Sequence, residues 1–147
     1  MMKKQTILVV EDNTLNMKLM RALLRLNNYR VLEAPDAETG IQIARLCRPA
    51  LILMDLRLPG IDGIRASRIL RSDARTESLP IVAVTSYAMS GDEEKARRAG
   101  CVEYVTKPID THQFPNLVAE IIQRFAGTDS NQTADPKNGA ETGLSGS

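Results

Sequence analysis

The feature that most constrains the fold of this 147-residue chain is a series of short, continuously apolar runs separated by segments with helical periodicity. A short apolar run bounded by polar residues is typical of a strand buried on both faces of a sheet. Strands that alternate with helices indicate a doubly wound α/β fold, here a five-stranded parallel sheet flanked by five helices. The five predicted strands are at 7–12, 29–34, 51–55, 81–85 and 102–106.

Capping residues and apolar spacing predict the helices between these strands. Asn13 or Thr14 caps the first helix, and Asp36 caps the second. Ser90 with Glu93 three residues later forms a capping box for the fourth helix. The third helix is predicted from about 64 to 71. The first helix is indicated by apolar residues at helical spacing, namely Leu15, Leu19, Ala22, Leu23 and Leu26.

The last helix is predicted to begin at about 111–113, so that Pro115 falls near its first turn, where proline is tolerated. From Gly127 to Ser147 the chain is rich in Gly, Ser, Thr, Asn and Asp. Such a segment buries too little apolar surface to offset its ordering entropy. We therefore expect one domain over residues 1–126, followed by a disordered tail over 127–147.

Composition excludes several classes of function. A formal net charge of +1 provides no basic surface of the kind that nucleic-acid binding requires. No apolar run approaches the ~20 residues that cross a bilayer, and the run at 7–10 is too short for a secretory signal. We expect a cytoplasmic protein without membrane or nucleic-acid partners. Cys47 and Cys101 are expected to be reduced thiols.

Polar side chains end the predicted strands. Right-handed crossovers gather the carboxyl ends of parallel strands at one edge of the sheet, where α/β proteins bind their ligands. Three carboxylates at one edge raise a pKa or hold a cation, and an all-oxygen site suits Mg²⁺. With one lysine and one threonine added, the set fits phosphoryl transfer. The residues expected to converge are Glu11, Asp12, Asp55, Thr85 and Lys107.

Four motifs in this order resemble the receiver domain of two-component response regulators: VVEDN at 9–13, MDLRLPGIDG at 54–63, VTS at 84–86 and TKP at 106–108. The resemblance covers about residues 5–126 and implies a flavodoxin-like, CheY-like sheet with strand order 2-1-3-4-5. Longer runs, such as VAVTSYAMSGDEEKARRAGC, are similar to the single-domain members of that family.

The resemblance implies a role for each acid. Asp55 accepts a phosphoryl group from a histidine kinase or a phosphotransfer protein. Asp12, Asp55 and the backbone carbonyl of Arg57 bind Mg²⁺, while Glu11 acts through water. Thr85 then binds the phosphoryl oxygens together with a lysine.

That lysine is Lys107, and by the same resemblance its bond to Pro108 is a cis peptide. Thr85 and Tyr104 form the switch that reports phosphorylation. A downstream protein is expected to bind the face formed by the fourth helix, the strand at 102–106 and the last helix. We expect a monomer or weak dimer that acts as a stand-alone switch and turns over no substrate other than its own phosphate.

Three other functions fit these residues less well. An aspartyl-phosphate phosphatase requires a second acid two residues after the nucleophile, where this chain has Arg57. A flavodoxin-type electron carrier requires a phosphate loop rich in Ser, Thr and Gly after the first strand, which is absent here. An adaptor that works without phosphorylation is disfavoured by the complete set of acceptor, metal and lysine residues.

Overall fold

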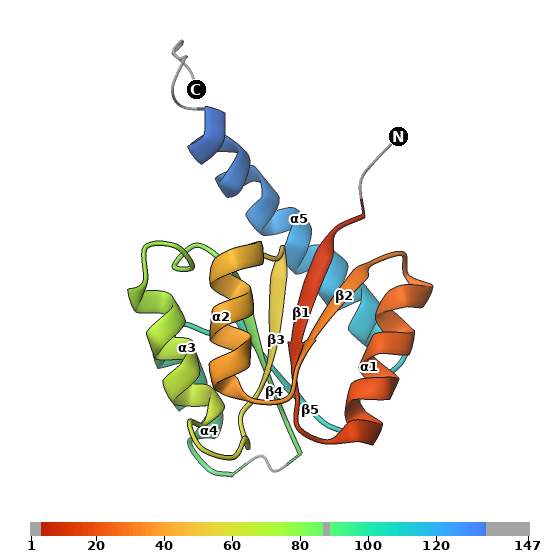
Figure 1. Ribbon diagram of the computed structural model, residues 1–147. Coiled ribbons are helices and arrows are strands. Elements are labelled where there is room, and N and C mark those ends of the chain that lie inside the picture. Colours follow the sequence, from red (N-terminus) through yellow and green to blue (C-terminus); the bar gives the residue numbers. More distant parts are fainter. Residues whose placement is uncertain (1–3, 87–88, 135–147) are drawn as a thin grey trace.

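The computed structural model describes residues 4–86 and 89–134, with side chains described as far as Ala126. Five parallel strands form one sheet in the order β2-β1-β3-β4-β5, as predicted (Figure 1). The strands are β1 Thr6–Val10, β2 Arg30–Ala34, β3 Leu51–Asp55, β4 Ile81–Thr85 and β5 Glu103–Thr106. The helices are α1 Thr14–Leu26, α2 Ala37–Cys47, α3 Gly63–Ser72, α4 Asp92–Arg98 and α5 Gln113–Ala134.

The two faces of the sheet bury two separate aliphatic layers. Alternate residues of a strand point to opposite faces, so Leu8 and Val10 pack under α2, α3 and α4, whereas Ile7 and Val9 pack under α1 and α5. Figure 1 shows the same division, with α2 and α3 in front of the sheet and α5 behind it. All five residues of β3 and of β4 are buried, because these central strands are covered on both faces.

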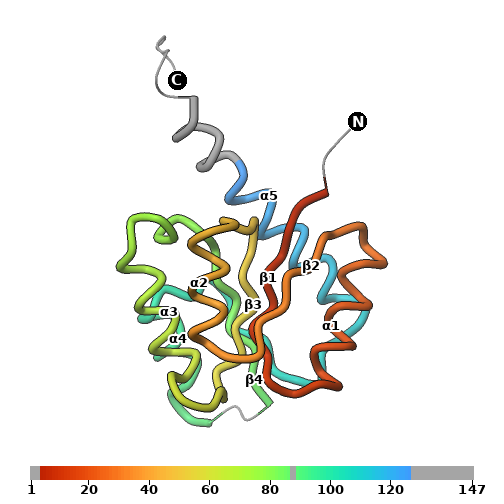
Figure 2. The backbone as a smooth tube through the Cα atoms, viewed as in Figure 1, coloured from red at the N-terminus to blue at the C-terminus, as the bar shows by residue number. Residues whose placement is uncertain are grey.

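Register places the ends of the central strands at the same level. Val10 of β1 pairs with Met54 of β3, so the next residue of each strand is an acid at the same edge. Asp55 pairs with Val84, and Thr85 pairs with Thr106. The tube in Figure 2 shows the chain leaving β1 and β3 at one end of the sheet. The predicted polar strand ends therefore share one edge.

Helix capping follows the sequence at two predicted sites and departs from it at a third. The side chains of Asn13 and Asp36 accept the backbone N–H three residues on, at 2.9 and 2.7 Å. Ser90 does not cap α4, so the predicted capping box is wrong. Gly91 takes a left-handed conformation with φ 86°, and the helix begins one residue later at Asp92. Glycine accepts this conformation without steric cost, and the acid suits the positive end of the helix.

Helix α1 buries a different stripe from the one that indicated it. The buried residues are Met17, Met20 and Leu24, whereas Leu15 and Leu26 are 75% and 82% exposed. The helix carries two apolar stripes, and the apolar residues of both recur at helical spacing. Spacing alone therefore does not show which stripe is buried. Packing against the sheet selects the one with the methionines.

Helix α5 is longer than predicted. It begins at Gln113 with Pro115 in its first turn, as expected, but it continues to Ala134. The helix therefore extends over residues 127–134, the first part of the segment predicted as a tail, and each residue added to an existing helix gains one further hydrogen bond. Residues 135–147 lie outside the described part of the chain. Among the described helices, none combines the length and apolar character required to span a membrane.

Candidate functional site

The carboxyl edge of the sheet brings two buried carboxylates against one ammonium group. Glu11 follows β1 and is 2% exposed, and Asp55 ends β3 and is 5% exposed. Lys107, which follows β5, places Nζ 2.6 Å from Oε1 of Glu11 and 3.4 Å from Oδ2 of Asp55. These three residues, far apart in sequence, were predicted to meet and do so.

Backbone N–H groups fix the remaining carboxylate oxygens. Oε2 of Glu11 accepts the N–H of Asn13 at 3.1 Å, and Oδ1 of Asp55 accepts the N–H of Arg57 at 3.0 Å. Both bonds close a turn directly after a strand, so each acid is held by the loop that it begins. One oxygen of each side chain therefore faces Lys107 while the other is anchored to the backbone.

Gly63, which had no predicted role, allows α3 to start against the end of β3. A Cβ atom built at Gly63 would lie 2.3 Å from the carbonyl oxygen of Asp55 and 2.8 Å from Cα of Leu56. The N–H of Gly63 also donates to the carbonyl of Leu56 at 3.2 Å. Only glycine fits this approach, which holds the loop after Asp55 in place. A glycine directly after the helix-capping Asp62 was the signal in the sequence.

Burial raises the pKa of the Asp55 carboxyl to about 6, because the charged form loses solvation. The neighbouring Glu11 carboxylate raises the pKa further, whereas the Arg57 N–H and the Lys107 ammonium oppose the rise. Asp55 is therefore mainly ionised at neutral pH, and its carboxylate is more basic than an ordinary aspartate.

A third carboxylate completes a cluster that fits a divalent cation. Oxygens of Glu11, Asp12 and Asp55 lie within 4.8 Å of one another, and Asp12 is exposed at the mouth. Three carboxylates against the single ammonium of Lys107 leave an excess of negative charge. Carboxylate oxygens that are partly open to water are the donors that Mg²⁺ prefers, and one or two of them usually suffice. The donor set therefore fits the predicted ion.

Thr85 and Lys107 are joined through the backbone. The N–H of Lys107 donates to the carbonyl of Thr85 at 2.8 Å, and Thr85 is fully buried at the end of β4. The Lys107–Pro108 bond is cis, as predicted.

The hydroxyl of Tyr104 is buried and has no hydrogen-bond partner within the described residues. Burial also raises the pKa of this phenol.

The side chain of Arg57 links this edge to α4. Its guanidinium pairs with Oδ2 of Asp92 at 2.6 Å, and the same carboxylate oxygen accepts the N–H of Met89 at 3.1 Å. The sequence pointed to the backbone carbonyl of Arg57 as a metal ligand, and it did not predict this pair. The two residues are 35 positions apart, and no motif connects them.

Comparisons with known proteins identify the family and agree with the fold. The family model described as response regulator receiver domain matches residues 7–119. The polar-differentiation response regulator DivK of Brucella anthropi is 40% identical over 123 residues, which cover 84% of this chain and 97% of that protein. DivK of Brucella ovis is 39% identical over the same length and shares.

Solved structures extend the comparison. The receiver domain of a sensor histidine kinase from Pseudomonas aeruginosa, with a magnesium ion coordinated in its active-site cleft, is 37% identical with a TM-score of 0.74. The match covers 85% of this chain and 99% of that one. A CheY-like receiver protein from Methanospirillum hungatei has a TM-score of 0.80 at 21% identity, covers 86% and 99% of the two chains, and shows the shared fold. Since the family model and the DivK relatives span most of the sequence, this chain belongs to the response regulator receiver domain family.

Proposed function

We propose that the chain accepts a phosphoryl group on Asp55 from a phosphohistidine of a partner protein and signals through contacts that depend on this phosphorylation. The observation that carries the proposal is the arrangement of Asp55, buried but anchored through Oδ1, with Lys107 Nζ 3.4 Å from the other oxygen. This arrangement gives a fixed nucleophile beside a fixed positive charge.

In the transfer step, a carboxylate oxygen of Asp55 attacks phosphorus. The new O–P bond forms as the N–P bond of the phosphohistidine breaks, and the imidazole nitrogen leaves with the electron pair. Lys107 offsets the charge on the phosphoryl oxygens, and positioning together with charge neutralisation supplies most of the catalysis in such reactions. Hydrolysis by water later restores the carboxylate, so we expect no turnover beyond the protein's own phosphate.

Asp12, Asp55 and, through water, Glu11 would hold the magnesium ion, with the carbonyl of Arg57 as a further predicted ligand. A bound ion supplies positive charge that orients and stabilises the transferring group. Glu11 has a second role in the structure, because it holds Lys107 at 2.6 Å. The lysine is thereby kept at the mouth before any phosphate arrives.

Thr85 and Tyr104 would couple the phosphate to the surface. The Thr85 hydroxyl donates to a phosphoryl oxygen in this proposal, and the resulting shift changes the packing around Tyr104. The Tyr104 hydroxyl is buried without a described partner, which costs about 1–3 kcal/mol and favours a residue that can change its position. A full shift of a two-state equilibrium needs about 5.5 kcal/mol, more than one hydroxyl bond provides. We therefore expect a partial shift, completed by the downstream partner on the α4–β5–α5 face.

The exposed stripe of α1 suits the phosphodonor. This helix begins directly after the loop that carries Asp12, so a partner bound to it would lie beside the mouth of the site. Leu15, Leu19 and Leu26 are 75%, 41% and 82% exposed. An apolar stripe on a helix favours a helical partner, which binds through its own apolar face.

The DivK relatives are named for polar differentiation, and we propose a comparable role in cell polarity or the cell cycle.

Acetyl phosphate with Mg²⁺ tests the assignment without a partner. We expect intact-mass analysis to show one added phosphate on the full chain, none on Asp55→Asn, and an unchanged result on the matched surface variant Asp62→Asn. Equal labelling of Asp55→Asn would overturn the assignment. A failure of the unmodified chain to take up phosphate from this donor and from every histidine kinase tried would instead favour a phosphorylation-independent adaptor.

A further inference from the structure

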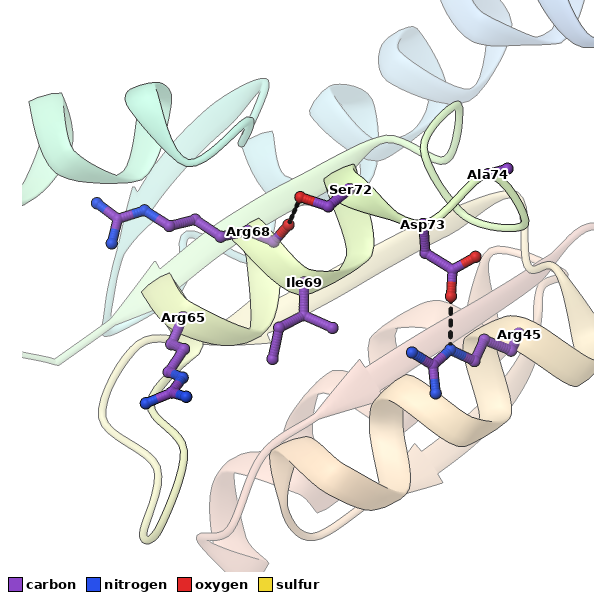
Figure 3. Close-up of a pocket in the computed structure, with 7 residues that line it drawn as sticks. All are labelled: Arg45, Arg65, Arg68, Ile69, Ser72, Asp73 and Ala74. Carbon is purple, nitrogen blue, oxygen red and sulfur yellow. Dashed lines mark hydrogen bonds and ion pairs between the residues drawn. The ribbon is translucent and has the colours of Figure 1, made fainter.

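A groove between α2 and α3 lies outside the phosphoacceptor site and shares no residue with it. It has a volume of about 840 Å³ and is lined by Arg45 of α2, by Arg65, Arg68, Ile69 and Ser72 of α3, and by Asp73 just beyond (Figure 3). The chain as a whole is almost neutral, yet three arginines border this one groove. The proposed phosphotransfer uses none of these side chains.

Two of the arginines are free to bind a ligand. The exposed side chains of Arg65 and Arg68 make no hydrogen bond or ion pair with any residue that the structure describes, and only their backbone groups are bonded. The third arginine of α3 differs, since Arg71 donates to the carbonyls of Glu77 and of Gly100. The helix therefore uses one arginine for packing and leaves two at the surface.

Arg45 is partly available. Its Nε donates to Oδ2 of Asp73 at 2.8 Å, and its terminal nitrogens make no bond within the described residues. Asp73 also binds Arg75 at 2.9 Å, so its charge is shared between two guanidinium groups. The ion pair thus orients Arg45 without satisfying its outer donors.

The distribution of these charges favours an extended ligand. In Figure 3, Arg65 and Arg68 point away from each other, and the Ile69 side chain lies between those of Arg65 and Arg45. Positive charge is therefore spread along the groove, with an apolar side chain between two guanidinium groups. A single phosphate would contact only one of them, whereas a peptide with carboxylates on either side of an apolar residue could use both. Guanidinium groups bind carboxylates with two parallel hydrogen bonds.

Two other classes of ligand fit less well. Single-stranded nucleic acids bind through aromatic stacking as well as charge, and no aromatic side chain is among the described residues that line the groove. A membrane surface is broad and uniformly anionic, whereas this site carries the acid Asp73 in its wall. We propose that the α2–α3 groove is a second docking site, which binds an acidic peptide segment of a protein partner, with carboxylates at Arg65 and Arg45 and an apolar side chain on Ile69.

The test uses the full chain and a fluorescein-labelled Glu-Glu-Leu-Glu-Glu peptide, with Gln-Gln-Leu-Gln-Gln as the neutral control. We expect the acidic peptide to bind and to shift the backbone amide resonances of residues 65–74, but not those of residues 11–13. The double variant Arg65→Glu/Arg68→Glu reverses the charge at one of the two proposed carboxylate contacts and at the other arginine of the groove that has no described partner, and it leaves the Arg45–Asp73 ion pair intact. It should weaken binding at least tenfold. Arg25→Glu/Arg30→Glu changes the net charge equally at exposed arginines elsewhere and should weaken binding less than threefold.

Four outcomes would overturn the proposal: no binding of the acidic peptide, equal binding of the neutral one, equal losses in the two double variants, or shifts outside the groove. Phosphatidylglycerol vesicles and an oligothymidine test the two other classes of ligand. If the chain bound either of them more strongly than the peptide, and lost this binding in Arg65→Glu/Arg68→Glu, the proposal would be overturned in favour of a lipid or nucleic-acid site. Because uptake of phosphate from acetyl phosphate is measured separately on Asp55, its failure would leave the groove result unaffected.

Discussion

The sheet edge around Asp55 and the α2–α3 groove both collect charged side chains, but they hold them in opposite surroundings. At the edge, Lys107 is 9% exposed between the buried carboxylates of Glu11 and Asp55. In the groove, Arg65 and Arg68 face solvent without a described partner. A buried charge depends on its partners for stability, whereas an exposed one is solvated by water. The same change of charge should therefore affect folding at one site and binding alone at the other.

Removing Lys107 should give the largest effect. Lys107→Ala leaves two buried carboxylates without their cation, and we expect a loss of about 3 kcal/mol in the free energy of unfolding by urea. Phosphorylation by acetyl phosphate should fall as well. Lys95→Ala, at an exposed position on α4, is the matched control and should change stability by less than about 0.5 kcal/mol. Equal stability of the two variants would mean that the edge is more hydrated than its geometry indicates.

Adding one methyl group at Gly63 should damage the edge without changing any charge. The new Cβ would lie 2.3 Å from the Asp55 carbonyl oxygen, so α3 or the end of β3 must move. We expect Gly63→Ala to lose about 2–3 kcal/mol, the upper part of the usual range for overpacking, and to accept phosphate more slowly.

Gly91→Ala is a useful contrast, because its Cβ would meet nothing within 4 Å and only its φ of 86° opposes the change. We expect a cost of about 1 kcal/mol there, measured by the same urea titration. A Gly63→Ala variant with normal stability and normal phosphorylation would show that the contact relaxes easily.

Neutralising Asp55 should stabilise the fold. The carboxyl has a pKa of about 6 in the folded chain against an ordinary value of 3.8 for an aspartate in water, so the folded state binds the proton more tightly. The free energy of unfolding therefore falls as pH rises from about 4 to 6. Above pH 6 the buried, ionised carboxylate keeps it at the lower value. We expect Asp55→Asn to be more stable than the unmodified chain by about 1–3 kcal/mol at pH 7.5, with little difference at pH 4.

Magnesium gives a second measurement of the same cost. Added Mg²⁺ should raise the melting temperature of the unmodified chain more than that of Asp55→Asn, because the ion binds the folded carboxylates. The difference in free energy of unfolding between Asp55→Asn and the unmodified chain should shrink toward pH 4. A difference that grows toward pH 4 would contradict the assigned direction of the pKa shift.

The smallest effects should come from the groove. Arg65→Ala and Arg68→Ala remove exposed guanidinium groups with no described partner, so the free energy of unfolding should change by less than about 0.5 kcal/mol. Uptake of phosphate on Asp55 should be unchanged, as intact-mass analysis would show. A loss of more than about 1 kcal/mol in either variant would indicate that these side chains have a structural role.

The strand ends show how far sequence patterns reach. The apolar runs predicted the five strands, and the polar residues at the carboxyl ends of four of them predicted the members of the edge site. Both follow from local rules, because a strand buried on both faces must be apolar and a parallel sheet places its carboxyl ends together. The four motifs also pointed to the receiver family before any distance was known.

What only the tertiary structure decided depends on contacts between distant segments. The sequence could not tell which apolar stripe of α1 faces the sheet, because Met17 and Leu15 belong to stripes with the same period. It did not predict that Lys107 binds Glu11 more closely than Asp55, or that Arg57 pairs with Asp92. Side-chain charge is a property of each residue, but its partner and its burial are set by how α2, α3 and the sheet pack. For this reason the residues of the sheet edge around Asp55 could be named from the sequence, whereas the α2–α3 groove became visible only in the folded chain.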